Sequence, residues 1–175
     1  FKGDYEIFDK FTAAKDELKK SFNQHAWDGE WYYRGTKDSG EKIGSKECED
    51  GKIYLNPQSW AVISDIAESE KKVQAMEAVR KHLLRDNGAL LLQPAYSKPD
   101  KYIGYLSRYA AGRRENGGVY SHAATWSIWA YSLLHDSETA YDIFKKMCPI
   151  YSGMNPDKYV AEPYVIPGNI DGPDS

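Results

Sequence analysis

The chain has 175 residues, of which 41% are hydrophobic and 28% are charged, and its formal net charge is −3. This length suits one domain with a substantial core. The small negative charge gives no support for a nucleic-acid or membrane-surface partner, and no apolar run approaches the roughly 20 residues needed to cross a bilayer.

Aromatic residues and cysteines narrow the class further. The chain contains 14 tyrosines and 5 tryptophans. Aromatic rings stack on the C–H faces of sugars and also fill cores, so this share favours a carbohydrate ligand without excluding a structural role. Cys48 and Cys148 lie far apart and lack metal-ligand or redox spacing, which predicts free thiols in a reducing compartment and no metal site.

The first half of the chain is predicted to hold three helices and two short strands. Apolar residues recur every three or four positions from Tyr5 onward, which predicts a helix with one apolar face that ends near Asn23. Strands are expected at residues 30–34 and 52–55 around a charged turn. A second helix begins near Pro57 and a third begins after Ser69 as its N-cap and continues to about residue 84.

The second half is predicted to hold one long connection and two helices. The connection runs over residues 93–121, and an aromatic-rich helix follows at 122–134. Ser137 is expected to cap a last helix that Pro149 stops, and the remainder is loop. Helices joined alternately by short turns and long loops predict an all-α barrel of helical hairpins with its site at the long-loop end.

The segment from Arg113 to His122 carries the most chemical information. It holds two arginines, a glutamate, an asparagine, a glycine pair and a histidine. Guanidinium groups match carboxylate or phosphate oxygens, and a histidine at a helix start lies where anions are favoured. These residues predict a site for an oxygen-rich, partly anionic ligand such as a sugar or a sugar phosphate. A salt-bridged surface loop is the alternative.

Three other polar groups have two readings each. Asp28 and Glu30 lie between aromatic residues, where desolvation raises the pKa of a catalytic acid, but they also suit a turn. Residues 46–49 either line a polar cleft or form a solvated face. The amides at positions 56 and 58 either order a helix start or bind sugar hydroxyls.

Several motifs resemble the disaccharide phosphorylases of glycoside hydrolase family 94. They are AWDGEWY at 26–32, GSKE at 44–47, GKIYLNPQSWAV at 51–62, RENGGVYSH at 114–122 and EPYV at 162–165. The resemblance implies that residues 1–175 are part of an (α/α)6-barrel catalytic domain with a small β-hairpin at the site end. It also implies a cytoplasmic enzyme, a possible homodimer, no cofactor, and a disaccharide and inorganic phosphate as substrates.

The resemblance implies inverting phosphorolysis, in which one carboxylic acid protonates the glycosidic oxygen while phosphate attacks the anomeric carbon from the opposite face. The family's acid belongs to a Trp-Asn-Asp element that does not occur in this sequence. We therefore expect no catalytic residue here, Asp28 included, and no turnover by these 175 residues alone. We expect a fragment of a longer chain, because the sequence starts at Phe1 and ends in a turn-rich stretch.

The resemblance also assigns binding roles. His122 matches the phosphate-binding histidine, and Tyr109 and Arg114 match acceptor-subsite positions. We expect Arg108 and Glu115 in the same subsite. Tyr105 replaces an acidic residue found in members that act on neutral disaccharides, and loss of a carboxylate beside arginines favours an anionic acceptor such as an aldonic acid. A glycan-binding fragment without chemistry, or a hydrolase on the same barrel, is the alternative.

Overall fold

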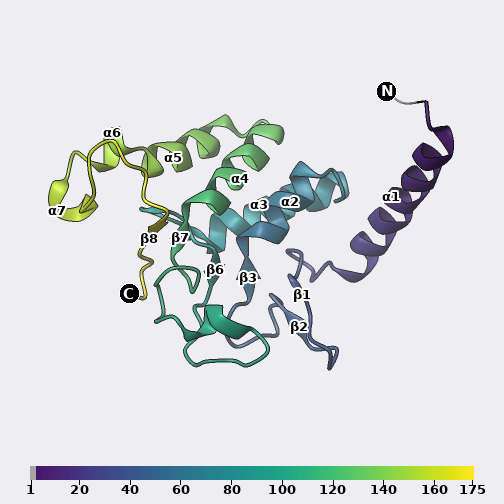
Figure 1. Ribbon diagram of the computed structural model, residues 1–175, viewed down its shortest axis with the longest axis horizontal. Helices are drawn as coiled ribbons and strands as arrows, with labels where there is room; N and C mark the ends of the chain where they lie inside the picture. The colour runs from purple at the N-terminus through teal and green to yellow at the C-terminus, as the bar shows by residue number, and fades with distance from the viewer. Residues whose placement is uncertain (1–2) are drawn as a thin grey trace.

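Two helices that contact each other form the centre of the fold, α2 (Leu55–Ile63) and α4 (Ser121–Leu133). The structure is a computed structural model that describes residues 3–175 (Figure 1). Helix α3 (Ser69–His82) packs against α2, and α5 (Ser137–Met147) packs against α4. Two consecutive helix pairs therefore lie side by side, and the mainly helical prediction is confirmed.

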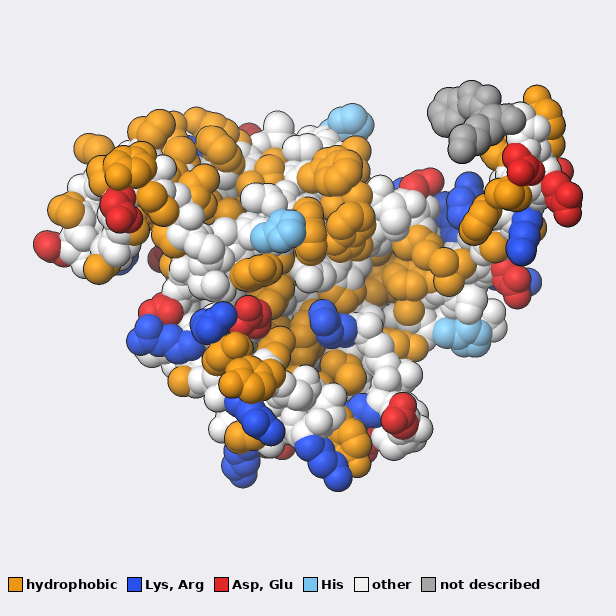
Figure 2. Space-filling model, in the orientation of Figure 1, with side chains coloured by type: hydrophobic (Ala, Val, Ile, Leu, Met, Phe, Trp, Pro, Cys, Tyr) orange, Lys and Arg blue, Asp and Glu red, His pale blue; other side chains and the backbone are white. Residues whose placement is uncertain are grey.

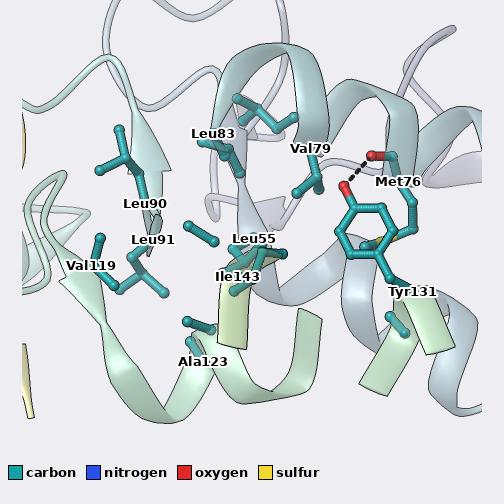
Figure 3. Packing of buried hydrophobic residues seen from close by; sticks show 14 of the residues in the cluster. Leu55, Met76, Val79, Leu83, Leu90, Leu91, Val119, Ala123, Tyr131 and Ile143 are labelled. Carbon is teal, nitrogen blue, oxygen red and sulfur yellow. Dashed lines mark hydrogen bonds between the residues drawn. The ribbon is translucent and has the colours of Figure 1, made fainter. Parts of the chain in front are cut away.

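The hydrophobic core lies between these four helices (Figure 3). Leu55, Val79 and Ile143 are fully buried there. Ala123 and Ala130 on α4 are fully buried as well, and their small side chains let the central helices approach closely. The hydroxyl of buried Tyr131 donates a hydrogen bond of 2.7 Å to the carbonyl of Met76, which fastens α4 to α3.

Short antiparallel strand pairs lie at one end of the central helices (Figure 1). The pairs are β1 (Gly35–Thr36) with β2 (Lys42–Ile43), β3 (Ile53–Tyr54) with β6 (Leu92–Gln93), β4 (Leu84–Arg85) with β5 (Gly88–Ala89), and β7 (Val119–Tyr120) with β8 (Asn169–Ile170). Strand β3 continues directly into α2, and β7 continues into α4. The first turns of both central helices therefore face the strands and long loops.

Helix α1 (Tyr5–His25) stands apart from the other helices (Figure 1). Asp4 caps it by accepting a hydrogen bond from the Ile7 N–H at 3.1 Å. The periodicity predicted the helix correctly. Only the end of its apolar face is covered within residues 3–175, where Phe22 stacks on Tyr32 with ring centroids 4.4 Å apart. Phe8 is 65% exposed and Phe11 is 69% exposed. No helix of the described residues is long and apolar enough to cross a membrane.

Several predicted element boundaries were wrong. Residues 30–34 form no strand; Tyr32 makes only an isolated bridge with Trp27, and the hairpin consists of β1 and β2 instead. The N-caps are Glu68 and Asp136, each one residue before the predicted serine. Asp136 is the better cap because its carboxylate accepts a hydrogen bond from the Thr139 N–H at 3.1 Å.

The predicted C-terminal loop region also contains helical turns. Pro149 ends α5 as expected, but it also begins α6 (Pro149–Ser152), because proline fits the first turn of a helix. A second short helix, α7 (Pro156–Tyr159), follows, and the chain then returns to pair β8 with β7. The last residues thus lie beside the segment that precedes α4.

Candidate functional site

Four predicted ligand-binding residues form one surface group, which we call the tyrosine–arginine stack. It consists of Tyr105, Arg108, Tyr109 and Arg114. The first two lie on the 3-10 helix η1 (Gly104–Arg108), Tyr109 directly follows that helix, and Arg114 lies in the loop after it. The two tyrosine rings meet edge to face with centroids 5.7 Å apart. The Arg108 guanidinium lies 5.7 Å from the Tyr105 centroid, and that of Arg114 lies 4.8 Å from the Tyr109 centroid. The stack therefore has a cation at each end.

The loop after η1 is closed by its own backbone. The Gly112 N–H donates to the Asn116 carbonyl at 2.8 Å, and the Asn116 N–H donates to Arg113 at 3.0 Å. Arg114 has a φ of 49°, a left-handed conformation that is costly for a residue with a β-carbon. Gly117 also has positive φ, and a β-carbon there would lie 2.9 Å from Ala95. The glycine at this position therefore permits the close approach of two segments of the chain.

The arginines differ in their partners. Arg113 forms an ion pair with Asp171, which fastens the loop to the C-terminal segment. Arg114 has only a loose contact, 3.6 Å from Nε to the Glu115 carboxylate. Arg108 has no carboxylate within ion-pair distance in the described part of the chain. The salt-bridged alternative thus describes Arg113, whereas Arg108 and Arg114 leave positive charge available at the stack. Figure 2 shows Lys and Arg side chains interspersed with apolar ones around this end of the molecule.

His122 belongs to a second, aromatic group. It is exposed and lies in the first turn of α4, with its ring centroid 4.5 Å from Trp126 and 6.2 Å from Tyr120. Trp126 in turn meets Trp60 of α2 at 5.2 Å. The N-cap residue Tyr120 has no side-chain bond to the first turn. The exposed imidazole thus lies at a helix start whose dipole favours an anion.

The structure therefore groups the predicted residues in two sets. Arg108, Tyr105, Tyr109 and Arg114 follow one another in a series of contacts, and Glu115 lies beside Arg114. The aromatic contacts of His122 are with Tyr120 and Trp126. The loop at 112–118 and strand β7 connect the two sets. Among residues 3–175, no group of three or more His, Cys, Asp or Glu side chains is arranged to hold a metal ion.

The contacts of Asp28 indicate a structural role for its carboxylate. Burial raises the pKa of its carboxyl, but the Lys46 N–H, the Ser45 hydroxyl and the Lys42 ammonium outweigh burial and hold that pKa below its ordinary value. Lys46 and Ser45 donate at 2.8 and 2.9 Å. A carboxylate held ionised in this way is a poor proton donor. The turn reading of Asp28 is the one that fits these contacts.

Two cavities flank the hairpin region. The larger, about 530 Å³, is lined by charged residues of the β1–β2 hairpin and of the loop at 96–103, together with Glu47, Cys48 and Glu49. Lys46 does not line this cavity, and Lys46, Glu47 and Glu49 are exposed, so each of the two alternatives describes part of the run at 46–49. The smaller, about 470 Å³, lies between α1 and α2 and is lined by Arg34, Asn56 and Trp60, among others. The Asn56 side-chain oxygen is buried there without a hydrogen-bond partner.

Two fully buried amides order the loops around the site. Gln58 accepts from the Tyr32 N–H at 2.9 Å and donates to the Tyr32 and Tyr54 carbonyls. The loop-ordering reading of this amide is therefore correct. Asn116 makes the same pattern of contacts with other segments, and its role was missed in the sequence. The only signal was an asparagine directly before a glycine pair.

Comparisons with known proteins agree on one family. A sequence model of the glycosyl hydrolase 94 superfamily catalytic domain matches residues 1–175. The chain is 36% identical over 156 residues to a solabiose phosphorylase of Paenibacillus borealis, which covers 89% of this chain and 20% of that protein. It is 32% identical over 166 residues to an N,N'-diacetylchitobiose phosphorylase of Vibrio proteolyticus, and the match covers 94% of this chain and 21% of that protein. It is 32% identical over 148 residues to a cellobionic acid phosphorylase of Neurospora crassa, and the match covers 84% of this chain and 19% of that protein. The chain thus spans about a fifth of the length of these relatives.

Proposed function

Since this chain belongs to the catalytic domain of the glycosyl hydrolase 94 superfamily, we propose that it is part of a longer disaccharide phosphorylase. The reaction is inverting phosphorolysis of a β-linked glucosyl disaccharide to α-glucose 1-phosphate and a free acceptor. The observation that carries the proposal is the exposed, anion-favouring position of His122 next in sequence to the loop of the tyrosine–arginine stack. Relatives named as phosphorylases support the reaction class.

In the proposed mechanism, His122 and the first turn of α4 hold inorganic phosphate. Phosphate attacks the anomeric carbon while a general acid outside this segment protonates the leaving oxygen. Phosphate is already an adequate nucleophile, so the protein needs to orient it and offset its charge, which is the work of fixed donors and cations. Within this chain Asp28 supplies no proton, because its contacts keep it ionised.

The stack is the proposed acceptor subsite. The ring of Tyr105 is exposed and that of Tyr109 is half-buried, and aromatic rings suit the C–H face of a sugar ring. The guanidinium of Arg108 suits a carboxylate. An aldonic acid acceptor follows from this charge, and one relative is named a cellobionic acid phosphorylase. Glu115 is proposed to belong to the same subsite, because its carboxylate lies 3.6 Å from the Arg114 Nε.

The helix pairs are proposed to be part of an (α/α)6 barrel. Trp129 on α4 is 51% exposed and Phe11 on α1 is 69% exposed, and such large apolar side chains are normally covered by neighbouring elements. Further helices of the longer chain would bury them. The consecutive pairs α2–α3 and α4–α5, with loops gathered at one end, support this arrangement (Figure 1).

The test compares disaccharide cleavage by the full-length protein with and without inorganic phosphate. The proposal predicts cleavage only with phosphate and a product whose proton NMR spectrum is that of α-glucose 1-phosphate. Cleavage at the same rate without phosphate would assign a hydrolase instead. Binding of the disaccharide without cleavage under either condition would assign a glycan-binding protein.

A further inference from the structure

We propose that Asn116 is a positioning residue for the acceptor subsite, holding Tyr109 and Arg114 in register through the backbone. This inference rests on the proposed function, and it concerns a residue whose side chain is inaccessible to a ligand. Asn116 is 0% exposed, so it acts only through the segments that it joins.

The side chain of Asn116 joins three stretches of chain. Its Oδ1 accepts a hydrogen bond from the Tyr96 N–H at 2.7 Å, and its Nδ2 donates to the Tyr96 carbonyl at 3.0 Å. The same Nδ2 donates to the Tyr109 carbonyl at 2.8 Å. The side chain of Tyr96 is itself fixed by a hydrogen bond, because its hydroxyl lies 2.7 Å from the hydroxyl of Tyr54, the residue directly before α2. The stack is thereby connected to the central helices.

Only an amide satisfies this arrangement. One planar group must accept from an N–H and donate to two carbonyls, which matches the oxygen and the two amide protons of asparagine. A carboxylate of the same shape would place an acceptor opposite both carbonyls. Alanine would remove the partner of three backbone groups, two of them buried. Gln58 repeats this pattern on Tyr32 and Tyr54, which indicates that the fold uses buried amides to fix loops.

The position of Asn116 explains why the stack depends on it. Tyr109 carries the ring at the centre of the stack, and its own carbonyl is one of the bonded groups. Arg114, in its left-handed conformation, lies between two backbone hydrogen bonds. The backbone N–H of Asn116 donates to the Arg113 carbonyl at 3.0 Å, and the Gly118 N–H donates to the Arg114 carbonyl at 3.1 Å. Loss of the Asn116 side-chain hydrogen bonds would therefore loosen the loop between Tyr109 and Arg114 at both of its ends.

The experiment compares Asn116→Ala and Asn116→Asp with Asn23→Ala in the full-length protein. Asn23 is a matched control: it is also a buried asparagine, 6% exposed, whose side chain bonds to Lys19, Ile66 and Glu68 far from the stack in sequence. Each variant is assayed for synthesis from α-glucose 1-phosphate and acceptor. The KM of each substrate and the unfolding temperature are measured.

We expect both Asn116 variants to raise the acceptor KM by about ten-fold or more and to leave the α-glucose 1-phosphate KM within about two-fold. Asn23→Ala is expected to lower the unfolding temperature without changing either KM. The proposal is overturned if the Asn116 variants lower the unfolding temperature and leave the acceptor KM at its wild-type value, or if both KM values rise together.

Amide hydrogen exchange separates this inference from the proposed function. If the unaltered protein shows no activity with any acceptor, the phosphorylase proposal fails and exchange decides the role of Asn116. We expect faster exchange of the Tyr96 and Gly118 amides in Asn116→Ala and wild-type exchange there in Asn23→Ala. Unchanged exchange at both amides in Asn116→Ala would overturn the role.

Discussion

The imidazole of His122 packs against the indole of Trp126 four residues later on α4, with ring centroids 4.5 Å apart and planes inclined by 54°. Side chains at this spacing lie on one face of a helix, so Trp126 limits how the imidazole can turn. No hydrogen bond within the described residues engages the His122 side chain. Its ring nitrogens are therefore oriented by packing and free to bind a ligand.

Replacement of His122 by alanine tests the phosphate assignment. In the full-length protein we expect kcat/KM for phosphate to fall by about a hundred-fold and the disaccharide KM to stay within about two-fold, because a donor to the anion is lost. Initial rates at varied phosphate concentration measure this. His25→Ala, at an exposed histidine of α1, serves as the control. Equal phosphate kinetics in the two variants would remove His122 from the site.

Replacement of Arg108 by alanine tests the charge of the acceptor. We expect the KM for gluconate to rise by about ten-fold and the KM for glucose to change by less than about two-fold, because only the anion loses a counter-charge. Lys101→Ala removes a nearby exposed cation as a control. A similar rise in KM for gluconate and glucose would show that Arg108 does not recognise the carboxylate.

The Asp28 contacts predict a dependence of stability on pH. The pKa of this carboxyl in the folded state is held below its ordinary value. The ionised carboxylate therefore contributes fully to the stability of the folded state above about pH 4, and this contribution is lost as the pH falls through the folded-state pKa. The free energy of unfolding of wild type should therefore exceed that of Asp28→Asn at neutral pH, and the gap should shrink in acid. Urea titrations across this range measure the gap, with Asp38→Asn as an exposed control. A gap that stays constant with pH would contradict the stated contacts.

The bond from Tyr131 to Met76 predicts a stability cost. Tyr131→Phe leaves the buried Met76 carbonyl without its 2.7 Å donor, and we expect the free energy of unfolding to fall by about 1–2 kcal/mol. Tyr141→Phe removes an exposed hydroxyl, and we expect a change near zero. Denaturant unfolding compares the two, and equal losses would count against the buried hydrogen bond.

The sequence predicted helices well where their periodicity was local. The helix from Tyr5 was found within two residues of its predicted end, because spacing along one helix needs no knowledge of its neighbours. The strand expected at 30–34 was wrong, because Gln58, distant in sequence, takes both backbone groups of Tyr32. Which surface an apolar helix face covers is likewise a tertiary property, and the Phe8 spacing carried no information on it.

The candidate site was predicted in composition and only partly in arrangement. The resemblance assigned Tyr109 and Arg114 to one subsite, and the structure places the Arg114 guanidinium 4.8 Å from the Tyr109 ring centroid. The ion pair of Arg113 with Asp171 and the clamp of Asn116 on Tyr96 join residues distant in sequence, so no local pattern indicated them.

The most direct measurement is phosphate release from α-glucose 1-phosphate by the full-length protein with gluconate, glucose or N-acetylglucosamine as separate acceptors. The account predicts release with an acceptor, fastest with gluconate, because Arg108 and Arg114 present positive charge beside the tyrosines of the stack. Absence of release with all three acceptors would contradict the phosphorylase assignment. Comparable rates with glucose and gluconate would contradict the anionic acceptor.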